Sequence, residues 1–277
     1  MKNLSEFSFK KRCQIKVVLT DIDDTLTSNG KLTSAVYSAL DSLQNAGYLV
    51  MPITGRCAGW CDHIARMWPV DAVVGENGAF YFKYNHEKKK MLQYFCQNEQ
   101  ALKQNKQKLQ ALSSQILSQV EGAGLASDQA YRLTDLAIDF AEDVKPLEQS
   151  AIDQITTIAE SLGAIAKVSS IHVNCWFGDH NKLSTSLKLL GDVFNMTDKQ
   201  LQKQVLFVGD SPNDASMFHY FDNSIGVANI KEISQQLPAE PTYITDGFSG
   251  EGFVEVANCL LDTQVQRVKL LAQIEPP

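Results

Sequence analysis

Three short apolar segments of the chain lead directly into polar residues, and this arrangement limits the fold more than any other feature. The segments, with the polar residues that follow them, are 17–19 with Asp21 and Asp23, 50–53 with Thr54, and 205–208 with Asp210. Patterns typical of helices occupy 34–46, 58–67 and 183–194. Strands that alternate with helices predict an α/β fold with a doubly wound parallel sheet. Because parallel strands end at one edge of a sheet, we expect these polar side chains to meet there.

The alternation of strands and helices breaks in the middle of the chain. A long helical pattern at 96–120, and a second helix predicted to begin at Lys145–Pro146, accompany strand-like runs at 131–140 and 164–176. Antiparallel-type strands with helices are typical of an α+β unit. The predicted division of the chain is an α/β core at 1–84 and 178–277 with an inserted α+β domain at 85–177.

Composition and charge exclude several classes of function. The chain has 25 Lys+Arg against 32 Asp+Glu, a net charge of −7, which argues against nucleic-acid and membrane partners because these require a basic face. No apolar stretch approaches the roughly 20 residues that cross a bilayer, and the N-terminal segment has no signal-peptide pattern. We expect a cytoplasmic protein with reduced cysteines that binds a small molecule. The sequence does not indicate its oligomeric state.

Carboxylates crowded at one sheet edge have a specific chemistry. They repel each other, and Mg²⁺, which prefers carboxylate, water and phosphate oxygens, relieves this repulsion. One carboxylate can attack phosphorus and form an aspartyl-phosphate, while a second protonates the leaving oxygen and then activates water. The Thr54 hydroxyl and the Gly55 amide are suited to hold phosphate oxygens. Each feature alone also fits a turn or a helix cap, but their coincidence at three strand ends favours phosphoryl transfer.

These residues resemble the motifs of the haloacid dehalogenase (HAD) phosphatase superfamily. The matching segments are Asp21–Leu26 as DxDxTL, Ile53–Arg56 as the Thr-containing second motif, and Gly209–Asp214 as GDxxND. Lys182 stands where the family's phosphate-binding lysine falls, and the alternative, Lys188, looks like a surface residue of its helix. The position of the insertion and the segment Glu76–Ala79 resemble subfamily IIB, the Cof-type and sucrose-phosphatase-like enzymes, whose α+β cap closes over the site.

The resemblance implies a role for each matching residue. Asp21 is expected to be the nucleophile and Asp23 the general acid/base, with Mg²⁺ on Asp21, the Asp23 carbonyl and Asp210, and with Asp214 as a ligand or a support for the metal's waters. The expected catalytic residues are Asp21, Asp23, Thr54 and Lys182. The expected phosphate and substrate contacts in the core are Thr54, Gly55, Arg56, Lys182 and Asn213. Arg56 either touches substrate or braces the Asp cluster, and the sequence leaves both open.

A polar strand face in the cap is the candidate for substrate recognition. Ser170, His172 and Asn174 alternate with apolar residues, so they share one side of the predicted strand. We expect this side to face the leaving group, and a solvent-facing side is the alternative. Asp139 is a weaker candidate.

The sequence therefore predicts a phosphoric monoester hydrolase that is Mg²⁺-dependent and acts on a small polar phosphate ester. Sugar phosphates, including sucrose phosphate, trehalose phosphate and mannosyl-phosphoglycerate, fit the polar cap face and the family. One alternative is a sugar phosphomutase of the phosphomannomutase type, which requires a bisphosphate activator. Others are a receiver-like, non-enzymatic phosphoacceptor, against which Asp23 and the cap argue, and a catalytically idle binding protein.

Overall fold

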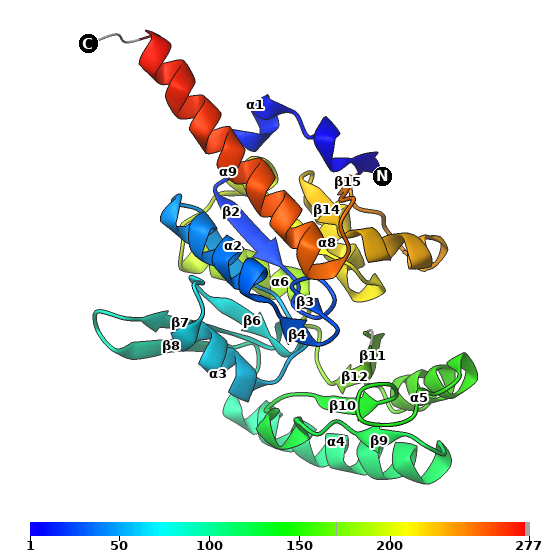
Figure 1. Cartoon of the computed structure of the whole chain (residues 1–277). Helices are drawn as coiled ribbons and strands as arrows, with labels where there is room; N and C mark the ends of the chain where they lie inside the picture. Colours follow the sequence, from blue (N-terminus) through cyan, green and yellow to red (C-terminus); the bar gives the residue numbers. More distant parts are fainter. Residues whose placement is uncertain (170, 275–277) are drawn as a thin grey trace.

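The structure is a computed structural model that describes residues 1–169 and 171–274. It consists of a core and a cap that lies below it in Figure 1, where the cap is drawn in green. We define the cap as residues 98–176 and the core as the described remainder. The predicted α/β architecture with an inserted α+β unit is confirmed.

The core is built on a six-stranded parallel sheet with the order β1-β15-β14-β13-β2-β5. Its strands are β1 (Lys2–Asn3), β2 (Val17–Thr20), β5 (Leu49–Pro52), β13 (Val205–Gly209), β14 (Ser224–Gly226) and β15 (Tyr243–Ile244). From β2 the chain adds β5 on one side, and after the cap it adds β13 to β15 on the other. The strand order therefore reverses between β2 and β13, and a crevice forms beyond the carboxyl ends of these two strands.

Helices cover both faces of this sheet (Figure 1). They are α1 (Phe9–Arg12), α2 (Ser34–Asn45), α3 (Ala58–Met67), α6 (Lys182–Asp192), α7 (Asp198–Gln204), α8 (Ala215–Tyr220) and α9 (Ser249–Ile274). Successive residues of a strand point to opposite faces: Val18 packs with Leu40 of α2 and Leu260 of α9, whereas Leu19 packs with Leu189 of α6. No helix in the described ranges is long and apolar enough to span a membrane.

A three-stranded antiparallel sheet extends the core beside β5. Its strands are β6 (Val73–Gly75), β7 (Phe80–Asn85) and β8 (Lys90–Phe95), and a parallel bridge between Ile53 and Val74 joins it to the main sheet. A small hairpin, β3 (Thr27–Ser28) with β4 (Lys31–Leu32), follows β2. The predicted boundary at residue 85 falls inside the β7–β8 hairpin, because β8 pairs with β7 along its length and Met91 and Phe95 pack against the core.

The cap is a four-stranded sheet whose order is β11-β12-β10-β9. Its elements are α4 (Glu99–Gln119), β9 (Gly124–Leu125), β10 (Leu136–Asp139), α5 (Gln149–Ser161), β11 (Ile165–Val168) and β12 (His172–Trp176). Both helices contribute to one apolar cluster on the same side of this sheet, and in Figure 1 α4 runs along the side away from the core.

Two predicted cap elements differ from the structure. The helix expected from Lys145–Pro146 begins at Gln149, because the backbone N–H of Leu147 donates to the carbonyl oxygen of Phe140 and Glu148 has extended backbone angles. The strand expected at 131–140 shortens to β10, because Gln129–Tyr131 forms a 3₁₀ turn. In both places local hydrogen bonds, rather than apolar periodicity, decide the local structure.

The two connections between core and cap lie side by side. Gln97 of the first donates from Nε2 to the carbonyl oxygen of Phe177 in the second. The second connection also passes close to Gly78, whose φ of +102° lies in the region that favours glycine, and a Cβ there would overlap the carbonyl oxygen of Asn181. The absence of a side chain at Gly78 therefore lets the chain pass close by as it enters α6.

Replacing Gly78 by Ala is expected to lower the free energy of unfolding by about 2 kcal/mol or more, because the new Cβ meets backbone at a strained φ. The melting temperature should fall by roughly 4–8 °C. Gly191→Ala is the matched control, since a Cβ at Gly191 in α6 meets open space, and it should leave the melting temperature unchanged or raise it. Equal melting temperatures for the two variants would contradict this role for Gly78.

His180, in the second connection, is buried without a partner for either ring nitrogen among the described residues. Its ring stacks on Trp176. Burial lowers the pKa of His180 from 6.5 to about 4. As the pH falls from 6.5 towards 4 the unfolded chain takes up a proton that the folded chain does not, so this residue makes the folded state less stable across that window.

His180→Phe is therefore expected to be more stable than the wild type, by about 1 kcal/mol at pH 7 because two orphaned nitrogens are removed. At pH 5 the margin should grow by roughly 2 kcal/mol. Urea unfolding at both pH values measures this difference in the free energy of unfolding. The control is His219→Gln, which replaces an exposed histidine of α8. A margin that does not change with pH would show that His180 does not titrate as described.

Candidate active site

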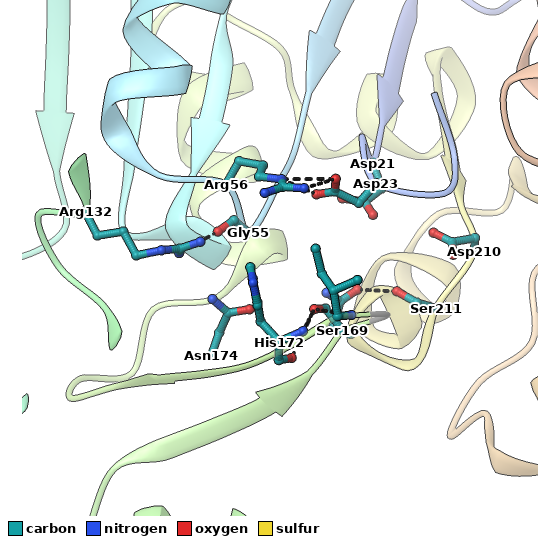
Figure 2. A pocket seen from close by; sticks show the side chains of 12 residues that line it. Asp21, Asp23, Gly55, Arg56, Arg132, Ser169, His172, Asn174, Asp210 and Ser211 are labelled. Atoms are coloured by element: carbon teal, nitrogen blue, oxygen red, sulfur yellow. Dashed lines mark hydrogen bonds and ion pairs between the residues drawn. The ribbon is translucent and has the colours of Figure 1, made fainter. Parts of the chain in front are cut away.

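The crevice at the strand reversal holds the predicted acidic residues. Asp21 follows β2, and Asp210 follows β13, its direct neighbour in the sheet. Asp21, Asp210 and Asp214 are buried, and each places one carboxylate oxygen within 4.8 Å of the other two. The acidic residues predicted at the ends of β2 and β13 thus meet at one edge, and Figure 2 shows Asp21, Asp23 and Asp210 around a common pocket.

Lys182, the first residue of α6, is the buried cation of this cluster. Its Nζ lies 2.9 Å from Asp21 Oδ1 and 2.7 Å from Asp214 Oδ1, and it also donates to Asn213 Oδ1. Although burial opposes the charge, the two carboxylates raise the pKa of Lys182 above its ordinary value. Lys188, the alternative lysine, lies exposed on α6 and pairs with Asp192.

One ammonium group does not balance the carboxylates around it. Burial raises the pKa of Asp21 to about 7, against the charge of Lys182 and with a contribution from Asp214 and Asp23. Burial and the neighbouring carboxylates also raise the pKa of Asp210. The site therefore has an excess of negative charge that a cation would relieve.

Two residues outside the predicted set orient Asp210. Thr25 donates from Oγ1 to Asp210 Oδ1 at 2.8 Å, and Asn229 donates from Nδ2 to Oδ2 at 3.3 Å. Asp214 instead binds its own loop, because its Oδ2 accepts the backbone N–H groups of Asp210 and Ser211. Asp214 is thus held in place by both the loop and Lys182.

Arg56 braces the second Asp of the motif. Its Nε lies 3.0 Å from both carboxylate oxygens of Asp23, and its Nη2 donates to Asp23 Oδ1 at 2.9 Å (Figure 2). The guanidinium also lies over the ring of Trp60 at 4.5 Å. Of the two roles left open by the sequence, the structure displays the bracing one. Thr54 is fully buried, and its hydroxyl oxygen accepts the N–H of Arg56, while Gly55 lines the pocket.

The predicted polar face of the cap turns toward the core rather than toward solvent. His172 and Asn174 of β12 are buried and line the pocket opposite Asp21 and Asp23 (Figure 2). The solvent-facing alternative is therefore wrong for these two residues. Ser170 lies outside the described residues, and Ser169 beside it lines the pocket.

Glu142 is a cap residue that the sequence analysis missed. Its Oε1 lies 3.0 Å from Arg56 Nη2, and its Oε2 lies 2.9 Å from His172 Nε2. The interaction with His172, with a further contribution from Arg56, lowers the pKa of Glu142 to about 2. Asp139, a weaker candidate, instead shapes the loop that presents Glu142. The one sequence feature that could have indicated Glu142 is the pair of acidic residues that follows the predicted strand at 131–140.

Two further missed residues join the cap to the core. Glu76 is buried in the core, and its carboxylate accepts hydrogen bonds from the backbone of Leu133 and Thr134 and from the Thr134 hydroxyl. Arg132 of the cap donates to the carbonyl oxygen of Gly55 and pairs with two cap carboxylates. The pocket between core and cap has a volume of about 20 Å³, room for about one water molecule, so an organic ligand does not fit into it with the cap in this position.

A doubly wound sheet with an acidic cluster at its strand reversal and an α+β cap over it defines a capped α/β protein with an acidic crevice. The sequence matches the haloacid dehalogenase-like hydrolase family over residues 18–158 and 94–246, and the chain belongs to this family. The predicted resemblance to the HAD superfamily and its subfamily IIB is confirmed, and the family is one of hydrolases. A search of the curated proteins returns no match.

Solved structures share this fold at low sequence identity. Protein 0175 of Thermoplasma acidophilum is 17% identical with a TM-score of 0.65, and the match covers 89% of this chain and 98% of that one. The sucrose-phosphatase of Synechocystis sp. PCC6803, solved with sucrose and phosphate, is 17% identical over 89% and 98% with a TM-score of 0.61. The C-terminal domain of C. albicans trehalose-6-phosphate phosphatase is 11% identical over 92% and 95% with a TM-score of 0.66.

Lys182→Met is expected to lower the free energy of unfolding by about 3 kcal/mol, because it leaves Asp21 and Asp214 buried without their cation. Lys188→Met, which removes an exposed lysine with one partner, should cost less than ~0.5 kcal/mol. Urea unfolding of both variants in the presence of a chelator makes the comparison. Similar values for the two would mean that the buried lysine does not balance the cluster.

Proposed function

We propose that the protein is a Mg²⁺-dependent phosphomonoesterase that hydrolyses a small sugar phosphate through an aspartyl-phosphate on Asp21. The observation that carries this proposal is the placement of Asp21, Asp23 and Asp210 at one pocket, with Lys182 against Asp21. Among the described residues of the pocket, only Asp21 combines a free carboxylate oxygen with a neighbouring acid for the leaving group.

The acidic cluster fits Mg²⁺. Its donors are the hard oxygen atoms that Mg²⁺ prefers. Burial, with a further contribution from neighbouring carboxylates, raises the pKa values of Asp21 and Asp210, and a bound cation would favour their ionised forms. Asp21, Asp210 and the Asp23 carbonyl would hold the ion, with Asp214 behind them. When bound, Mg²⁺ supplies positive charge that keeps Asp21 ionised and stabilises the charge of the transferring phosphoryl group.

The chain's own residues account for both chemical steps. Asp21 Oδ1 is bound to Lys182, which leaves Oδ2 to attack phosphorus; the new P–O bond forms as the ester P–O bond breaks, and the electron pair leaves with the alcohol oxygen. Asp23 donates a proton to that oxygen. Asp23 then takes a proton from water, the water oxygen attacks phosphorus, and the bond to Asp21 breaks to release phosphate and the free carboxylate.

The polar wall of the cap supports a sugar as the leaving group. His172, Asn174 and Ser169 line the pocket opposite the carboxylates, and they offer the donors and acceptors that hydroxyl groups need. The solved relatives include a sucrose-phosphatase and a trehalose-6-phosphate phosphatase, which agrees with this class of ester. Six cysteines without a disulfide among the described residues agree with the proposed cytoplasmic location.

Phosphate release from a panel of sugar monophosphates, measured with Mg²⁺ and with chelator, tests the proposal. We expect release by the wild type that chelator removes, and a loss of at least about 10³-fold in kcat for Asp21→Asn, because the amide cannot serve as the nucleophile. Asp192→Asn, an exposed position on α6, is the matched control and should keep its rate.

Release that persists in Asp21→Asn would overturn the nucleophile, and release that persists in chelator would overturn the metal. Conversion of a sugar 1-phosphate into a 6-phosphate on addition of a bisphosphate would instead show the phosphomutase. The receiver-like alternative has no support in the family match, which is to hydrolases.

A further inference from the structure

The Glu142 carboxylate bridges two residues that line the pocket, Arg56 on the core side and His172 on the cap side. One oxygen contacts Arg56 of the core and the other contacts His172 of the cap. The same nitrogen, Arg56 Nη2, also binds Asp23 Oδ1 at 2.9 Å. The two carboxylates therefore share one N–H-bearing atom, and the distance between their bound oxygens is at most about twice that value. Glu142 thus lies next to the place where Asp23 must meet the leaving oxygen.

Every arginine and lysine at the pocket already has at least two carboxylate partners. Arg56 binds Asp23 and Glu142, and Asp128 lies 4.0 Å from its Nη1. Arg132 binds Asp128 and Asp135, and no other arginine or lysine among the described residues lines the pocket. Lys182, behind the pocket, binds Asp21 and Asp214.

Three carboxylates, those of Asp21, Asp23 and Asp210, and two arginines are among the described residues that line the pocket, so its wall carries more negative than positive charge. Lys182 and a bound Mg²⁺ would offset the negative charge of the phosphoryl group. A second anionic group on the leaving side would lie near Asp23 and Glu142, where both arginines are already paired with carboxylates. Like charges in a site that excludes water are strongly unfavourable. Hydroxyl groups, in contrast, can donate to carboxylate oxygens.

We infer that Glu142 is a specificity-determining residue that selects phosphate esters of uncharged polyhydroxy alcohols and rejects esters that carry a second anionic group. The inference rests on the proposed function and narrows its substrate class. Glu142 accepts hydrogen bonds from leaving-group hydroxyls and excludes a carboxylate or a second phosphate by repulsion. Glu142 lies in a loop whose backbone N–H groups donate to the Asp139 carboxylate, so Asp139 positions Glu142 for this selection.

Two matched pairs of esters test this selection. Glycerol 3-phosphate and 3-phosphoglycerate differ in one carboxylate, and fructose 6-phosphate and fructose 1,6-bisphosphate differ in one phosphate. In each pair we call the ester without a second anionic group the uncharged member, because its alcohol part is uncharged. For the wild type with Mg²⁺ we expect kcat/KM to favour this member by at least about tenfold. Glu142→Gln keeps the shape but removes the charge, and the preference should fall to about threefold or less.

The control variant is Glu121→Gln, which removes a carboxylate from an exposed position of the cap and should keep the wild-type preference. Glu142 is 28% exposed, so Glu142→Gln is expected to fold, and a melting temperature near that of the wild type verifies this. A preference that Glu142→Gln leaves unchanged overturns the inference, as does a wild-type preference for the charged member of each pair.

A general aryl ester separates this inference from the proposed function. Asp21-dependent release from p-nitrophenyl phosphate, with no release from either uncharged member, overturns the substrate class and leaves the phosphatase standing. Absence of Asp21-dependent release from every ester, p-nitrophenyl phosphate included, overturns the proposed function itself.

Discussion

The contact between Lys182 and the carboxylates of Asp21 and Asp214 is the interaction on which the rest of the site depends. It brings a cation from the first turn of α6 into a cluster of buried acids that the fold assembles at its strand reversal. Without this charge the acids would repel each other and take up protons. Since Lys182 directly follows the second core–cap connection, and Gly78 packs against the backbone of that connection, the insertion of the cap and the charge balance of the site are set by the same stretch of chain.

The cap completes the site with polar rather than apolar contacts. Glu76 of the core accepts a hydrogen bond from the backbone of Thr134 in the cap, and Arg132 of the cap donates to the carbonyl oxygen of Gly55 in the core. Glu142 adds a third bridge through Arg56. Buried polar groups are costly to leave unpaired, so these contacts favour the closed arrangement. One of them, made by Glu142, also places a carboxylate beside Asp23. Closure and selection of an uncharged alcohol thus follow from one set of side chains.

The sequence predicts the core well because its signals are local. Apolar strands followed by Asp21, Thr54 and Asp210 place the site without knowledge of any contact. The elements and contacts that the sequence does not predict depend on pairing between segments. For example, β8 forms because it pairs with β7, and its residues carry no strand pattern of their own. Arg56 was placed at the pocket, but its bond to Asp23 appears only in three dimensions. Glu142 was missed because a turn held by side-chain hydrogen bonds, not periodicity, presents it.

The central claim is that a phosphoryl group passes through Asp21. Enzyme mixed with an accepted ester and Mg²⁺, quenched in acid during turnover and reduced with borohydride, can be digested and sequenced by mass spectrometry. Borohydride converts an aspartyl-phosphate into homoserine, so the account predicts homoserine at position 21 and unmodified aspartate at position 23. Phosphate release with a phosphoryl group on another residue, or with Asp21 unchanged throughout turnover, would contradict it.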